Sequence, residues 1–329
     1  MGHLYAMRMG YFLSTEEFTP AELVEQARLA AEAGFTSLFV SDHYHPWNDE
    51  QGQSPFVWSI IGAVSQVCDL PITTAVTCPT VRIHPAIIAQ AAATSAVLTN
   101  GRFHLGVGSG EALNEHILGD AWPAAEVRLQ MLEEAIEIMR ELWTGKVVNH
   151  DGRFYTVDHA RLYTIPDTPP DVYVSAFGPK AIDLAADIGD GFISTKPDAD
   201  AVRRFREAAG TGNTHGKPTL AATKGCWAPS VDEGLDIAYR LWPNEGLPGE
   251  LAQVLPTPEH FEQASTLVTP DRMKMPRGPD PEPYLELATQ YAEAGFDVLH
   301  VAAVGPHYKQ LIDMYATEVL PRFHAPEAQ

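Results

Sequence analysis

An aspartate and a histidine stand side by side in the run Ser41-Asp42-His43-Tyr44-His45-Pro46-Trp47. A carboxylate beside an imidazole holds the ring in one tautomer and raises its basicity, so His43 is a candidate proton acceptor near neutral pH. The plain structural alternative is a capping aspartate next to a surface histidine. We favour proton transfer because the run directly follows a predicted barrel strand, where such folds carry their active sites.

His43 and His45 also form an H-x-H pair, which is typical of barrel hydrolases that hold zinc at a strand end. Such a site needs further ligands at later strand ends. Two of those ends, Ser175-Ala176-Phe177 and Ala302-Ala303-Val304-Gly305, offer no carboxylate. We therefore expect no metal and keep a zinc-dependent hydrolase as an alternative.

A glycine-rich run follows another predicted strand and reads Gly108-Ser109-Gly110-Glu111-Ala112-Leu113-Asn114-Glu115. Glycines let a planar ligand approach the backbone, and the carboxylate and amide just beyond them can protonate and orient it. Glycines also serve tight turns for purely steric reasons, so the string alone is a weak signal.

The run Phe177-Gly178-Pro179-Lys180 leads from a strand into a helix. The first turn of a helix presents free N–H groups, which together with Lys180 form an arrangement that binds phosphate. An ordinary Gly-Pro helix start explains the same residues equally well.

Strands and helices alternate along the chain, which predicts a parallel sheet. Eight strands buried on both faces favour a closed (β/α)8 TIM barrel over an open sheet, with residues 1–329 forming one domain. The predicted strands are Met9–Leu13, Ser37–Ser41, Ile72–Thr77, Phe103–Val107, Val172–Ala176, Gly191–Ser194, Thr219–Thr223 and Val298–Ala302.

Two stretches interrupt the alternation and are predicted to be insertions, near residues 145–170 and 242–283. The first contains a plausible hairpin around Asp151-Gly152, and the second is rich in proline. Long loops in a compact domain are usually functional, so we expect one of them to cover the mouth of the barrel.

The net charge of −21 repels phosphate backbones and anionic lipid, so we expect no nucleic-acid and no membrane partner. Three widely spaced cysteines, no leader-like start and no apolar run of about 18 residues favour reduced thiols and a cytoplasmic location.

Several motifs together resemble the luciferase-like barrel superfamily, and within it the coenzyme F420-dependent glucose-6-phosphate dehydrogenase branch. They are Ser41-Asp42-His43 to Trp47, Ala75-Val76 with Pro79-Thr80, Gly108 to Glu115, and Gly189-Asp190-Gly191-Phe192. The resemblance extends from Gly10 to Arg322. It implies a small-molecule substrate and hydride transfer between C5 of the F420 deazaflavin and a hydroxyl or carbonyl carbon.

The same resemblance implies roles for individual residues. His43 would remove the substrate hydroxyl proton, Glu111 would supply a proton to the ring, and Trp47 would help hold the reacting substrate. A cis peptide would lie between Ala75 and Val76. The positions that match cofactor contacts are Asp42, Ala75, Val76, Cys78, Gly108, Asn114, Ser175, Ala176, Phe177 and Gly178.

The substrate is where the chain departs from this branch, whose members grip a sugar phosphate with two lysines and an arginine. Asp198 and Ala252 occupy the lysine positions, while Arg272 matches the arginine, and Thr195 and Lys196 lie near the first position. Losing two charge-assisted contacts at about 1.5–3 kcal/mol each would weaken sugar-phosphate binding.

We therefore expect an F420-dependent oxidoreductase whose substrate need not be phosphorylated. The alternatives are an F420-dependent glucose-6-phosphate dehydrogenase, a flavin mononucleotide (FMN) monooxygenase of the same superfamily, and a binding barrel without catalysis. Related barrels commonly pair through helices, so a homodimer is expected.

Overall fold

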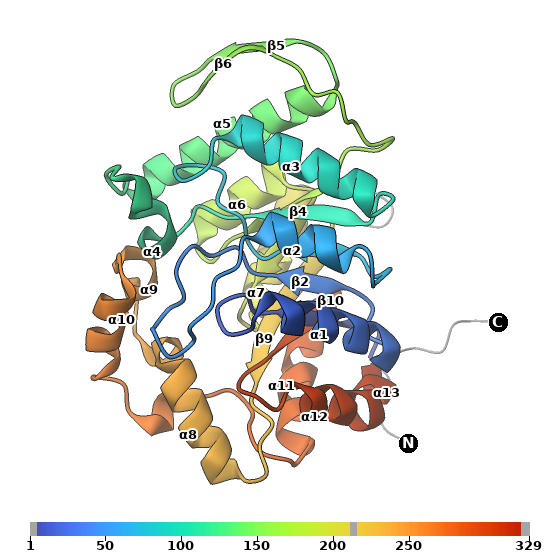
Figure 1. Ribbon diagram of the computed structural model, residues 1–329, viewed down its shortest axis with the longest axis vertical. Coiled ribbons are helices and arrows are strands. Elements are labelled where there is room, and N and C mark those ends of the chain that lie inside the picture. The colour runs from blue at the N-terminus through green and yellow to red at the C-terminus, as the bar shows by residue number, and fades with distance from the viewer. Residues whose placement is uncertain (1–4, 211–215, 324–329) are drawn as a thin grey trace, which may run out of the picture.

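The computed structural model describes residues 5–210 and 216–323. Eight parallel strands close into a barrel in the order β1-β10-β9-β8-β7-β4-β3-β2 (Figure 1), which confirms the predicted (β/α)8 fold. The barrel strands are β1 Arg8–Leu13, β2 Leu38–Val40, β3 Ile72–Thr74, β4 Phe103–Val107, β7 Val172–Ser175, β8 Gly191–Ser194, β9 Thr219–Gly225 and β10 Val298–Ala303.

Alternate residues of each strand point into the barrel, as the pleat of a β-strand requires. An inner core forms where these residues meet, and it contains Phe39, Tyr173, Ile193, Leu220 and Val298. The outward-facing residues pack against the surrounding helices in the main core. This alternation decides which side chains reach the mouth at the strand ends.

Helices surround the barrel (Figure 1). The first begins at the capping box of Thr19 and Glu22, and ends at Gly34, whose φ of 97° suits glycine. The helices are α1 Pro20–Ala33, α2 Val57–Val64, α3 Pro85–Leu98, α4 Ala112–Glu115, α5 Ala125–Trp143, α6 Pro179–Ile188, α7 Ala199–Ala209, α8 Val231–Leu241, α9 Leu251–Val254, α10 Pro258–Ser265, α11 Glu282–Glu293, α12 Tyr308–Met314 and α13 Leu320–Phe323.

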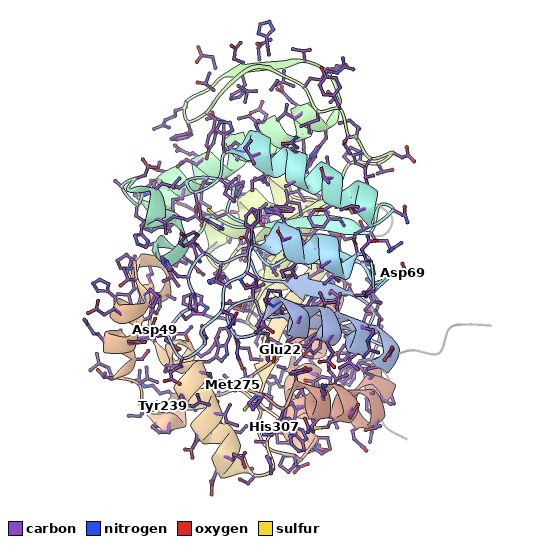
Figure 2. All side chains as sticks on the ribbon, in the orientation of Figure 1. Glu22, Asp49, Asp69, Tyr239, Met275 and His307 are labelled. Atoms are coloured by element: carbon purple, nitrogen blue, oxygen red, sulfur yellow. The ribbon has the colours of Figure 1, made fainter. Side chains whose placement is uncertain are left out.

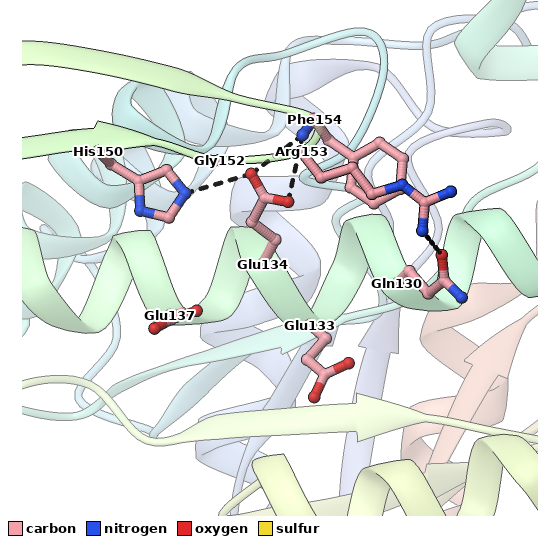
Figure 3. Close-up of a pocket in the computed structure, with 8 residues that line it drawn as sticks. All are labelled: Gln130, Glu133, Glu134, Glu137, His150, Gly152, Arg153 and Phe154. Carbon is pink, nitrogen blue, oxygen red and sulfur yellow. Dashed lines mark hydrogen bonds and ion pairs between the residues drawn. The ribbon is translucent and has the colours of Figure 1, made fainter.

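The first insertion is the predicted hairpin, formed by β5 Val148–Asp151 and β6 Thr156–Ala160. It lies over α5, where Glu134 accepts hydrogen bonds from the backbone N–H groups of Phe154 (3.1 Å) and Tyr155 (3.0 Å). Between the hairpin and α5 lies a hollow of about 370 Å³ (Figure 3). None of the predicted site residues lines this hollow.

The second insertion lies at the carboxyl ends of the strands. Asn48 and Gln51, from the loop after β2, donate hydrogen bonds to the carbonyl oxygen of Leu241, at 3.0 and 2.8 Å. Asp49 of the same loop donates its backbone N–H to Glu262 (3.1 Å), and Figure 2 shows Asp49 on the same side of the molecule as Tyr239 of α8. Residues 242–283 therefore cover part of the mouth, as one insertion was expected to do.

Several strands differ from their predicted bounds, most of them by one or two residues. The strand predicted over 72–77 ends at Thr74, and Thr77 makes an isolated bridge to Val107. The helix that begins at Tyr308 is α-helical to Met314 and continues as a π-turn over Tyr315–Val319.

Candidate active site

His43, Trp47 and Glu111, predicted from different parts of the chain, meet at the mouth of the barrel. His43 Nε2 lies 4.0 Å from Glu111 Oε2, and its ring centroid lies 5.2 Å from that of Trp47. The loops after β2 and β4 carry these residues, and both strands end at the same mouth of the barrel on either side of β3. An acid, a base and an aromatic side chain thus share one small space.

Two contacts at Nδ1 hold the imidazole of His43 in place. Its Nδ1 lies 3.1 Å from an acceptor, the carbonyl oxygen of His45, and 3.1 Å from a donor, the amide nitrogen of Asn114. The ring can therefore keep its orientation whether or not Nδ1 carries the proton. When Nδ1 is protonated, the Nε2 lone pair faces the mouth, which is the arrangement that a general base requires.

Sequence analysis did not identify Glu16, which the structure places beside His43. Glu16 Oε1 lies 3.4 Å from His43 Nε2, and Glu16 Oε2 accepts a 2.6 Å hydrogen bond from the Ser41 hydroxyl. The side chain is buried, so its charge can stabilise a protonated His43 with little screening. Its position just after β1 is the signal in the sequence, because residues that follow a barrel strand lie at the mouth.

Glu111 has the ionisation behaviour of a group that can hold a proton at neutral pH. Its pKa is raised to about 7, chiefly by loss of hydration; His43 opposes this shift, and the neighbouring carboxylate of Glu16 adds to it. A carboxyl group with such a pKa can exchange a proton near physiological pH.

Trp47 forms part of an apolar wall. Its indole packs edge-on against Phe261 of α10, with ring centroids 5.0 Å apart, and its backbone N–H donates to Gln51. The buried cluster around it includes Leu113, Trp242 and Val304. This side of the mouth therefore suits an uncharged, partly apolar molecule.

Asp42 and Asn114, both predicted to contact cofactor, have structural partners of their own. Asp42 Oδ1 pairs with Arg82 Nη2 (2.9 Å), and Asp42 Oδ2 accepts from Thr77 (2.8 Å). Asn114 Oδ1 accepts from the backbone N–H groups of Tyr44 (2.8 Å) and His45 (3.2 Å), and so fixes the His43 loop. Contact of either residue with cofactor stays a prediction.

Arg82 is a buried cation between Asp42 and Glu115, whose Oε1 lies 3.5 Å from Arg82 Nε. Arg82→Met should lower the free energy of unfolding by about 3–5 kcal/mol, because two buried carboxylates lose their counter-charge. Urea denaturation measures this loss. Arg28→Met, which breaks the exposed Arg28–Glu32 pair, should cost about 0.5 kcal/mol or less; equal losses in the two variants would contradict the assignment.

Ala75 and Val76, two of the predicted cofactor residues, present an apolar surface that suits a flat ring, and we call this surface the Ala75-Val76 seat. Ala75 and Val76, joined by the predicted cis peptide, are half-buried and pack on the inner barrel core. A Cβ added to Gly108 would stand 2.8 Å from Val76 Cγ2, so glycine is needed where the two loops meet. Cys78 is buried beneath, and its Sγ lies 3.0 Å from Thr80 Oγ1.

The predicted phosphate loop lies at the head of α6. Phe177 and Gly178 are exposed, and a Cβ on Gly178 would meet nothing within 4 Å, so the start of α6 is open to a ligand. Ser175 is half-buried and Ala176 buried. A ring over Ala75-Val76 with a phosphate at α6 fits these residues.

The substrate residues predicted by resemblance do not gather into a cationic pocket. Thr195 and Lys196 are exposed after β8, and Arg272 is exposed on a separate 3₁₀ turn, Pro270–Arg272. Asp198 caps α7 by accepting from the N–H groups of Asp200 and Ala201, both at 3.0 Å. A lysine at position 198 could not accept these hydrogen bonds, so capping of α7 explains the aspartate at this position.

The zinc alternative required His43 and His45 to face one ion. Instead, His45 Nδ1 lies 3.0 Å from the carbonyl oxygen of Leu113. Over residues 5–210 and 216–323, no three His, Cys, Asp or Glu side chains are grouped so that they could hold a metal ion. In the same ranges, no helix is long and apolar enough to cross a membrane.

Comparison with known proteins agrees with this geometry. The sequence model of the luciferase-like monooxygenase family matches residues 2–242. An F420-dependent glucose-6-phosphate dehydrogenase of Beutenbergia cavernae is 35% identical, over 98% of this chain and 99% of that protein. The enzyme of the same name from Mycobacterium tuberculosis is 34% identical, over 96% and 98%.

Solved structures give the same result. An F420-dependent secondary alcohol dehydrogenase in complex with an F420-acetone adduct superposes with a TM-score of 0.89 at 31% identity, covering 97% of this chain and 99% of that one. An F420-dependent tetrahydromethanopterin reductase from Methanopyrus kandleri shares the fold, with a TM-score of 0.77 at 17% identity. The chain belongs to the luciferase-like monooxygenase family, in its F420-dependent glucose-6-phosphate dehydrogenase-like branch.

Proposed function

We propose that this F420-dependent oxidoreductase interconverts an uncharged secondary alcohol and its ketone. The observation that carries the proposal is the facing pair of His43 Nε2 and Glu111 Oε2, 4.0 Å apart beside the Ala75-Val76 seat and the apolar wall of Trp47. This arrangement offers a base to the substrate, an acid to the cofactor, and an apolar surface to the substrate carbon.

When bound, F420 accepts or supplies the hydride at C5 of its deazaflavin. In the oxidising direction, His43 Nε2 takes the hydroxyl proton as the substrate carbon gives up its hydride, so the alcohol becomes a ketone. Glu16 stabilises the positive charge that forms on His43, and Glu111 gives its proton to the cofactor ring. The insertion and Trp47 exclude water from this exchange.

The substrate assignment is supported by the residues at the positions where the branch grips a sugar phosphate. Lys196 and Arg272 are exposed on separate segments, and Asp198 places a negative charge where the branch carries a lysine. The related enzymes also differ in whether their substrate is phosphorylated, since one is named for glucose 6-phosphate and another for secondary alcohols. The apolar wall favours the second class.

The cofactor choice is tested by titrating F420 with purified protein and following deazaflavin fluorescence, with FMN as the competing ligand. We expect saturable binding of F420 that excess FMN does not reverse. A yellow protein that carries FMN and consumes oxygen would instead support the monooxygenase alternative. Turnover of a secondary alcohol panel against glucose 6-phosphate then tests the substrate class, and preference for the sugar phosphate would contradict it.

Three broader assignments belong to the same proposal. A cytoplasmic location is supported by three buried cysteines without disulfides. One domain over residues 1–329 is supported by the main core, which draws on residues from Met7 to Phe323. A homodimer is proposed because related barrels commonly pair through helices. The molecular mass from sedimentation at several protein concentrations would test it.

A further inference from the structure

Lys224 lies near the carboxyl end of β9, at a position that faces into the barrel mouth. Leu220 and Ala222, which lie four and two residues before Lys224, belong to the inner barrel core. Because side chains alternate along a strand, Lys224 points to the same interior, one layer closer to the mouth. Its charge is felt at Glu111, where it acts to lower the pKa.

The ammonium group of Lys224 already has a partner. Lys224 Nζ lies 2.5 Å from Glu245 Oε1 and 4.2 Å from the centroid of the Trp242 ring. Only 22% of the Lys224 side chain is exposed, so this pair is partly shielded from water. Glu245 comes from the second insertion, on the 3₁₀ turn Pro243–Gly246.

The partner residues are themselves fixed in place. Trp242 Nε1 donates a 2.8 Å hydrogen bond to Glu17, which also accepts the backbone N–H of Gly305. The preceding residue, Leu241, holds the loop that carries Trp47 through its carbonyl oxygen. Glu245 therefore stands against Lys224 as part of the same packed unit that forms the apolar wall.

We propose that Glu245 is a specificity-determining residue, which neutralises Lys224 and so excludes phosphorylated and other anionic substrates from the mouth. The inference rests on the proposed function, because it takes this mouth to be the substrate site. A phosphate dianion needs a free cation, but Lys224 is paired with Glu245, and Glu16 and Glu111 add further carboxylates at the mouth. The net charge of −21 opposes anion entry as well.

The test compares wild type with Glu245→Gln, which keeps the shape of the side chain and removes its charge. Calorimetric titration with inorganic phosphate and with glucose 6-phosphate is carried out on cofactor-free protein, so the readout does not depend on turnover. We expect affinity for both anions to rise about tenfold or more in Glu245→Gln. The rise should vanish in Lys224→Met/Glu245→Gln, which lacks the Lys224 cation.

Glu32→Gln is the matched control, since it removes one carboxylate from an exposed ion pair on α1. It should bind the anions as wild type does. The proposal is overturned if Glu245→Gln gains no affinity over wild type or if the gain survives loss of Lys224. Glu245→Ala repeats the test should the glutamine variant not fold. Failure of the proposed function would appear separately, as absence of F420 binding by wild type.

Discussion

His43→Ala should lower kcat/KM for alcohol oxidation by about 10²- to 10⁴-fold, the usual contribution of a positioned general base. Affinity for F420 should stay nearly unchanged, because the seat at Ala75-Val76 and the head of α6 do not depend on the imidazole. The loss arises because the variant lacks the imidazole that lies beside Glu16 and Glu111, in position to take the hydroxyl proton. Steady-state kinetics and F420 titration of the same preparation measure both quantities.

His45→Ala is the matched control for this variant. His45 is two residues away, but its Nδ1 faces the carbonyl oxygen of Leu113 and not Glu111. We expect the kcat/KM of His45→Ala to remain within about tenfold of wild type, because this variant loses packing contacts but keeps the group that transfers the proton. Equal losses in the two variants would contradict the base assignment and favour the zinc alternative, in which both histidines are ligands.

Glu111→Gln should lower kcat for alcohol oxidation by about 10²-fold or more, because the amide cannot give a proton to the cofactor. The pH dependence of wild-type activity should also reflect proton donation by Glu111. Burial raises the pKa of Glu111 to about 7, so the acid form predominates below that pH and is lost above it. Oxidation by wild type should therefore decline as pH rises through about 7.

The residual activity of Glu111→Gln should lack that decline, since no group with this pKa remains in its place. Profiles of kcat/KM, which report ionisation of the free enzyme, provide the comparison. Glu115→Gln would be a poor control because Glu115 pairs with buried Arg82, so Glu32→Gln on the surface serves again. A decline near pH 7 that persists in Glu111→Gln would assign it to another group.

The barrel could be predicted because it rests on local signals, and so could the placement of His43 and Glu111 at its mouth. Alternating apolar residues indicate strands such as β4, and the helical period indicates α5. Strand ends in a parallel barrel converge, so residues just past β2 and β4 had to meet. Resemblance supplied the cis peptide at Ala75-Val76, which the structure contains.

Other parts of the site depend on contacts between distant segments, which no local pattern encodes. Lys224 and Glu245 are paired because an insertion folds back over the mouth. Arg82 neutralises Asp42 and Glu115 from the loop after β3, although each of the three is unremarkable in its own run of sequence. Glu16 was overlooked for a different reason, since its position after β1 follows the same rule that identified His43.

The central claim, direct hydride transfer between an uncharged alcohol carbon and F420, is tested by isotope transfer. Wild-type protein is incubated with F420 and a secondary alcohol that carries deuterium on its hydroxyl-bearing carbon, and the reduced cofactor is examined by mass spectrometry. We predict one deuterium per reduced cofactor, and none when the label is in the hydroxyl group. Reduction without deuterium, or no reduction by any secondary alcohol, would contradict the account.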